Sequence, residues 1–134
     1  MAKEYRIFIS HSWAYHTDLE ALRNLLNSRG YFNVEFTESS KDVPINSTNS
    51  VYIKSQLKSK ILSSDIVLAM AGIYASHSEW MIWELETARD YSIPIIGIIP
   101  RGQERISQEV YSRSKIDIRW NTEAIVDAIR TYSR

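Results

Sequence analysis

A tryptophan and a glutamate lie one helical turn apart in the stretch SEWMIWELETA, residues 78–88. At about 100° per residue, Trp80 and Glu84 share one flank of the helix that this stretch predicts. That flank borders the stripe expected to face the core, which consists of Met81, Leu85 and Ala88. A carboxylate half-buried against an aromatic ring is a group whose pKa and reactivity proteins tune. Glu84 is therefore the first candidate for a catalytic residue, with a solvated helix carboxylate as the simpler alternative.

The elements that must position Glu84 alternate along the chain. Strands are predicted at YRIFIS (5–10), FNVEFT (32–37), DIVLAMAG (65–72), PIIGIIP (94–100) and KIDIRW (115–120). Helical spacing of Leu19, Leu22 and Leu26, of Ile53, Leu57 and Ile61, and of Ile125, Val126 and Ile129 predicts helices between and after them. We expect an α/β, flavodoxin-like three-layer fold in one domain, 1–134. Its five-stranded parallel sheet has the order 2-1-3-4-5, with helices on both faces.

This topology predicts where a ligand binds. In such sheets, ligands lie beyond the carboxyl ends of the strands, at the switch point between the first and third strands. Two segments are expected to meet there, SHSW at 10–13 and GIYASHSEW at 72–80. The second segment leads directly into the helix of Glu84, so topology and the helix pattern indicate the same place.

Composition excludes several classes of function. Sixteen basic residues balance sixteen acidic ones, which argues against a general nucleic-acid binder. The absence of cysteine excludes disulfides and thiolate metal sites, and it fits a cytoplasmic protein. No apolar run reaches the roughly 18 residues that a membrane span requires. None of the three histidines has metal-ligand spacing, so we expect no metal.

Several of these motifs resemble the TIR domain family. Its Trp-Cys-x-x-Glu-Leu signature, on the helix after the third strand, is similar to Trp80, Met81, Glu84 and Leu85, with methionine in place of cysteine. The stretch IFISHSW, 7–13, resembles the family's first-strand motif, and loop 38–50 takes the place of its BB loop. The chain is most similar to short TIR-like proteins of bacteria and archaea, including the sensor subunit of Thoeris antiphage defence.

The resemblance implies an enzyme that takes NAD+ as its substrate and uses no separate cofactor. Enzymatic TIR domains cleave the bond between nicotinamide and ribose, and Glu84 matches their catalytic glutamate. A carboxylate suits this reaction because it stabilises the oxocarbenium character of the ribose. Water as acceptor gives ADP-ribose, and an internal acceptor gives a cyclic isomer. In a Thoeris-like setting, a cyclic product would activate a separate effector protein.

The resemblance and the topology together give a set of residues expected to bind the substrate around Glu84. They are Phe8, Ser10, His11, Ser12, Trp13, Tyr74, His77 and Trp80. Trp80 supports Glu84 or lines the nicotinamide pocket, or it only packs in the core. His11 binds phosphate or ribose, or it is a satisfied loop histidine. Trp13 stacks on adenine, or it packs against the first helix.

A non-catalytic interaction module is the alternative function. Trp83 is predicted to point outward, and with loop 38–50 it would form the assembly surface. Self-association is also expected for an enzymatic TIR domain. A phospho-receiver is rejected because its acidic residues after the first strand are absent. A flavodoxin is rejected for lack of a glycine-containing phosphate loop, and a dinucleotide-binding Rossmann domain for lack of GxGxxG.

Overall fold

The computed structural model describes residues 5–11, 16–29, 32–35, 47–48, 50–72, 79–100 and 106–133. Most of loop 38–50, which was predicted as the BB loop, lies outside these residues. Within the described ranges, no helix has the length and apolar character needed to cross a bilayer.

All strand pairs in the described part of the chain are parallel. The five strands there form one sheet in the order β2-β1-β3-β4-β5. The predicted α/β class with a parallel sheet is therefore confirmed. The strands are β1 (Tyr5–Ser10), β2 (Phe32–Glu35), β3 (Ile66–Met70), β4 (Ile95–Ile99) and β5 (Ile116–Arg119).

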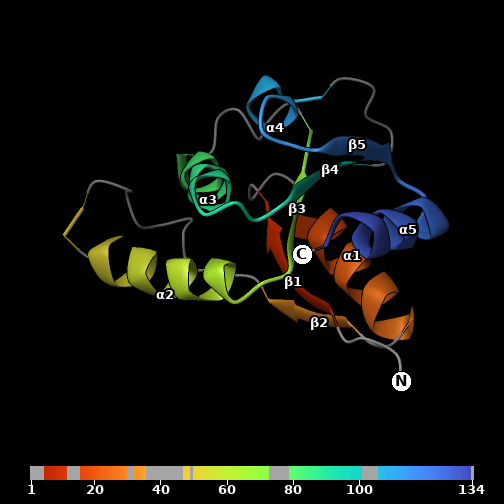
Figure 1. Cartoon of the computed structure of the whole chain (residues 1–134), viewed down its shortest axis with the longest axis horizontal. Helices are drawn as coiled ribbons and strands as arrows, with labels where there is room; N and C mark the ends of the chain where they lie inside the picture. Colours follow the sequence, from red (N-terminus) through yellow and green to blue (C-terminus); the bar gives the residue numbers. More distant parts are fainter. Residues whose placement is uncertain are drawn as a thin grey trace.

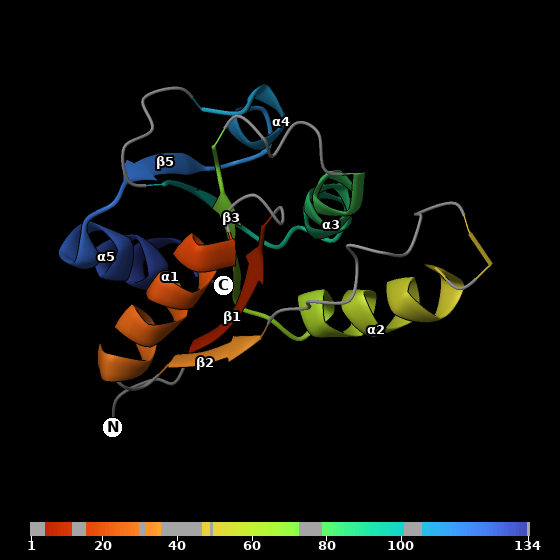
Figure 2. The same ribbon diagram turned by 180° about the vertical axis from the view of Figure 1, so that it is seen from behind.

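Helices cover both faces of this sheet (Figure 1). They are α1 (His16–Arg29), α2 (Ser50–Leu62), α3 (Glu79–Asp90), α4 (Gln108–Tyr111) and α5 (Thr122–Tyr132). α1 and α5 lie on one face, and α2, α3 and α4 lie on the other, as the view from behind also shows (Figure 2). The short helix α4 lies between β4 and β5 in the chain.

Alternation along β1 divides its side chains between the two helical layers. Ile7 and Ile9 belong to the core cluster on the side of α1 and α5. Phe8 belongs to the second cluster, with residues of α2, α3 and α4. Because side chains point to opposite faces with a period of two, Ser10 must share the face of Phe8. The strand therefore directs one hydroxyl group towards the layer that contains α3.

The helix α3 presents the predicted stripe to this second cluster. Met81, Leu85 and Ala88 are fully buried, as the helical spacing indicated. The prediction that Trp83 points freely outward was wrong. Trp83 is half-buried and packs against the second cluster. The helical pattern assumed that only one face of α3 is covered, but α2 and α4 also contact this helix.

Replacing Leu85 with alanine tests the packing of α3 on the sheet. We expect Leu85→Ala to lower the free energy of unfolding by about 2–5 kcal/mol, because a cavity replaces a fully buried side chain. As a control, Val51→Ala changes a residue that is 69% exposed on α2. It should alter stability by less than about 0.5 kcal/mol in the same urea titration. Equal effects of the two substitutions would contradict the described core.

Candidate active site

Ser10 and Glu84 meet at the carboxyl end of β1. The hydroxyl group of Ser10 donates a hydrogen bond of 2.7 Å to Glu84 Oε1. Ser10 is the last residue of β1, and its register partner on β3 is Ala69. The small Ala69 side chain lies on the same side of the sheet as Phe8. The contact therefore lies between β1 and β3, at the edge of the sheet where a ligand was expected.

Glu84 is more deeply buried than the sequence indicated. The helical pattern placed it on a half-buried flank, but only 3% of Glu84 is exposed. Burial disfavours the charged carboxylate and raises the pKa of Glu84 to about 8, against an ordinary value of 4.5. The Ser10 hydrogen bond acts in the opposite direction and lowers this pKa. At neutral pH, the native protein therefore holds Glu84 mostly as the neutral acid.

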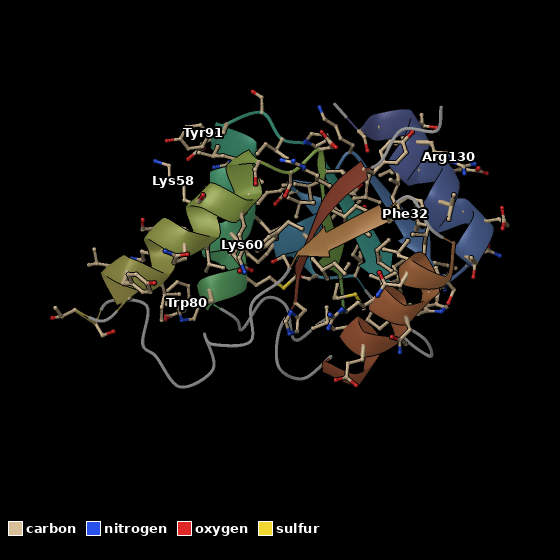
Figure 3. All side chains as sticks on the ribbon, turned by 90° about the horizontal axis from the view of Figure 1, so that it is seen from below. Phe32, Lys58, Lys60, Trp80, Tyr91 and Arg130 are labelled. Atoms are coloured by element: carbon tan, nitrogen blue, oxygen red, sulfur yellow. The ribbon has the colours of Figure 1, made fainter. Side chains whose placement is uncertain are left out.

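Trp80 lies one helical turn before Glu84 on α3 and is almost fully buried. It is 7% exposed and belongs to the cluster that contains Phe8 and Met81. Its ring meets the ring of Trp83 edge to face, with centroids 6.1 Å apart and planes at 77°. Figure 3 shows Trp80 at one end of α3 and Tyr91 beyond the other end. An indole at this end of the helix removes water from the first turns of α3, which helps to keep Glu84 dry.

The other predicted substrate-binding residues fall into two groups. Phe8 is fully buried in the core, and His11 directly follows β1 with its Nε2 atom shielded from solvent. The remaining four lie outside the described residues: Ser12, Trp13, Tyr74 and His77. The structure thus brings together Ser10, Glu84 and the aromatic pair of Phe8 and Trp80 on one side of the sheet. Within the described ranges, no group of three histidine or acidic side chains is placed to hold a metal ion.

The sequence interpretation missed the specific pairing of Ser10 with Glu84. Ser10 was selected only because it follows the first strand, and its expected contact was the substrate. Alternation along β1 carried a signal for the pairing, because Ser10 shares the face of Phe8 and that face is covered by α3. The contact itself joins residues 74 positions apart, which no local pattern reports.

The raised pKa predicts how Glu84 affects stability. Between pH 4.5 and about 8, the unfolded chain holds an ionised Glu84 while the native protein retains the proton. The native state therefore binds more protons, and its stability falls as the pH rises through this window, by at most about 1.4 kcal/mol per pH unit. The amide of Glu84→Gln does not titrate, so this variant does not lose stability in this way as the pH rises.

Urea unfolding of both proteins from pH 5 to pH 8 measures this effect. We expect the free energy of unfolding of Glu84→Gln to rise steadily relative to the unchanged protein as the pH increases. Parallel curves for the two proteins would mean that the native carboxyl ionises as it does in the unfolded chain.

Solved structures with the same fold include two enzymes. One is a 2-deoxyribosyltransferase from Bacillus psychrosaccharolyticus, with a TM-score of 0.68 and 16% identity over 90% of this chain and 89% of that one. The other is a CMP N-glycosidase, BcmB, from Clostridium botulinum, with a TM-score of 0.59 and 14% identity over 93% of this chain and 98% of that one. At these identities the likeness shows the fold alone.

Sequence comparison identifies the family. No curated protein matches the chain significantly. The family model for the Thoeris protein ThsB, TIR-like domain, matches residues 8–105, which include the end of β1 and all of β3 and α3. The match therefore contains both Ser10 and Glu84, and it agrees with the signature around Trp80. The chain belongs to the Thoeris ThsB TIR-like domain family.

Proposed function

We propose that this protein cleaves the bond between nicotinamide and ribose in NAD+, with Glu84 as the catalytic residue. The observation that carries the proposal is the buried Glu84 carboxyl group, which accepts a 2.7 Å hydrogen bond from Ser10 at the switch point of the sheet. Buried acids with a strongly shifted pKa gather at functional sites more often than at structural ones. Membership of the ThsB TIR-like family adds independent support.

The chemistry requires one group that favours positive charge on the ribose. The bond from C1′ to the nicotinamide nitrogen breaks, and its electron pair stays on nicotinamide, which leaves as a neutral molecule. The ribose then carries oxocarbenium character, which an ionised Glu84 stabilises. Water adds to C1′ and loses a proton, giving ADP-ribose. If an atom of the same molecule adds instead, the product is a cyclic isomer.

Substrate charge favours the active form of Glu84. The nicotinamide ring of NAD+ is cationic, and a nearby positive charge favours the ionised carboxylate. The positive charge passes to the ribose as the bond breaks, and a dry site strengthens its attraction to the carboxylate. Burial thus keeps Glu84 neutral in the free protein. Once the substrate is bound, the same burial strengthens the attraction between the ionised Glu84 and the positive charge on the ribose.

The names of the two structurally similar enzymes describe related chemistry. A 2-deoxyribosyltransferase and a CMP N-glycosidase both act on a sugar that is bonded to a base. This supports a nucleotide as the substrate class. In the setting of antiphage defence, we propose a cyclic ADP-ribose isomer as the product and a separate effector protein as its target. Self-association of the chain would complete the binding site.

Substituting Glu84 tests the proposal directly. We expect Glu84→Gln to lower nicotinamide release from NAD+ by about 10²–10³-fold or more, because the stabilising charge is lost. Asp90→Asn, an exposed change on the same helix, should leave the rate within about twofold. Chromatography of the nucleotides measures both, with purified protein at high concentration and with lysate from phage-infected cells.

The contrary outcomes are distinct. Turnover that survives Glu84→Gln would assign the reaction to another residue. A folded, unchanged protein that releases no nicotinamide under either condition would favour the interaction module. The exposed Val51 and Tyr52 on α2, at 69% and 72%, would then be the first surface to substitute in place of the half-buried Trp83.

Ser10 is proposed as a positioning residue, and the pH profile tests that role. We expect kcat/KM to rise with pH with a midpoint near 8, because the ionised Glu84 is the active form. Ser10→Ala removes the hydrogen bond that lowers the pKa of Glu84, so the midpoint should move to higher pH. Ser64→Ala, a buried serine whose hydroxyl donates to the Lys60 carbonyl, should leave the midpoint unchanged. An unmoved midpoint in Ser10→Ala would reduce Ser10 to a packing or substrate contact.

A further inference from the structure

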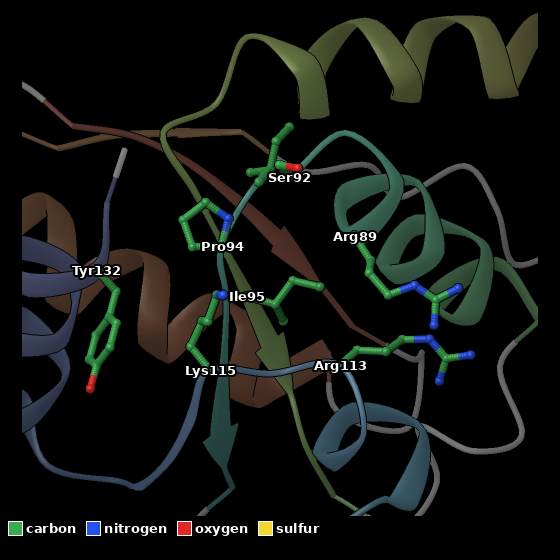
Figure 4. A pocket seen from close by; sticks show the side chains of 8 residues that line it. Arg89, Ser92, Pro94, Ile95, Arg113, Lys115 and Tyr132 are labelled. Atoms are coloured by element: carbon green, nitrogen blue, oxygen red, sulfur yellow. The ribbon is translucent and has the colours of Figure 1, made fainter.

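A cavity of about 370 Å³ lies at the amino ends of β4 and β5, whereas Ser10 lies at the carboxyl end of β1. The residues around it come from the end of α3, the start of β4, the turn before β5 and the end of α5 (Figure 4). They are Arg89, Ser92, Ile93, Pro94, Ile95, Arg113, Lys115 and Tyr132. The volume falls within the range of about 300–1,000 Å³ that is typical of small-molecule sites. Nothing in the proposed NAD+ cleavage uses this cavity.

Among the described residues, the lining contains three cations and no carboxylate, although one of these cations, Arg113, is paired with acidic side chains behind the lining. Arg89 and Arg113 lie at one end of the cavity, Tyr132 lies at the other, and Lys115 lies between them in Figure 4. Within the described ranges, Arg89 pairs with Asp90 at 3.8 Å, and both side chains are more than half exposed, so this pair is weak. Cations grouped around a concave surface favour an anionic ligand.

Arg113 is held in place by two acidic neighbours. Its terminal nitrogens pair with Glu86 and Glu109, each at 2.9 Å. These pairs orient the guanidinium group, whose side chain is only 11% exposed. Because two carboxylates already balance its charge, Arg113 forms a fixed part of the wall, and Arg89 and Lys115 supply the positive charge that a ligand meets.

Ser92 contributes a hydroxyl group at a backbone cost. Its φ of 60° lies in the left-handed region, where glycine is the residue that fits without strain. Ser92 follows α3, and the Ile93 amide closes the helix end by donating to the Ala88 carbonyl. Glycine would adopt the same turn with less strain, but it would not place a hydroxyl group on the wall of the cavity as Ser92 does.

We propose that this cavity binds a nucleoside diphosphate or a close chemical relative. Arg89 and Lys115 would hold the phosphate oxygens by charge-assisted hydrogen bonds, and the Ser92 hydroxyl group would add a neutral one. Ile93, Pro94, Ile95 and the ring of Tyr132 provide apolar surface for an aromatic base. The site is separate from Glu84, which lies in the middle of α3 and contacts Ser10 at the carboxyl end of β1.

Isothermal titration calorimetry with ADP tests the proposal. We expect ADP to bind the unchanged protein, and we expect about tenfold or greater weakening of this binding in the double variant Arg89→Ala/Lys115→Ala. Arg130→Ala, an exposed charge change on α5 outside the cavity, should alter the affinity less than twofold. Ser92→Gly should raise thermal stability and weaken ADP binding, a combination that a purely structural serine would not produce.

Three further titrations complete the test. Glu84→Gln should bind ADP as the unchanged protein does, so failure of NAD+ cleavage leaves this result intact. Adenosine and pyrophosphate should each bind more weakly than ADP, since each lacks half of the proposed contacts. The proposal is overturned if ADP gives no heat at millimolar concentration, if the double variant binds ADP normally, or if pyrophosphate binds as tightly as ADP.

Discussion

The hydrogen bond between Ser10 and Glu84 joins the sheet to α3 inside a layer that is built mostly from apolar side chains. A carboxylate in such a place loses its hydration, and one serine hydroxyl replaces little of it. The acid therefore keeps its proton up to about pH 8 in the free protein. The apolar side chains of the same layer hold α3 in this position. Met81 and Leu85 pack α3 on the sheet, and Trp80 packs at the first turn of α3.

α3 holds ionisable side chains in two different surroundings. In the middle of the helix, Glu84 is buried, neutral and hydrogen-bonded to the neutral Ser10. Near its end, Arg89 is exposed and lies with Arg113 beside an open cavity. A nearby positive charge favours the ionised form of a buried acid, whereas an exposed guanidinium group favours an anion. One helix thus places ionisable groups in two different environments.

Several features could be predicted because they depend on local pattern. The continuous apolar runs of β3 and β4 indicated strands that are covered on both faces, and these strands are almost completely buried. The stripe of Met81, Leu85 and Ala88 indicated the face of α3 that packs on the sheet. Trp83 shows where the pattern fails. A helical angle defines one direction, while the exposure of a flank depends on whether neighbouring helices cover it, as α2 and α4 do here.

The sequence by itself determined the class of fold and the family, because strands, helices and motifs follow one another along the chain in a characteristic order. It also determined Glu84 as the candidate acid, because helical spacing placed it beside the core stripe of its own segment. Only the tertiary structure decided that Ser10 is the partner of Glu84, since packing sets the distance between residues 74 positions apart. It also decided the depth at which Glu84 lies, and therefore its pKa. The cavity beside Arg89 and Arg113 is formed from three separate stretches of chain, 89–95, 113–115 and Tyr132, that share no motif. Periodicity reports the face of an element, but contacts between elements exist only once the chain has packed.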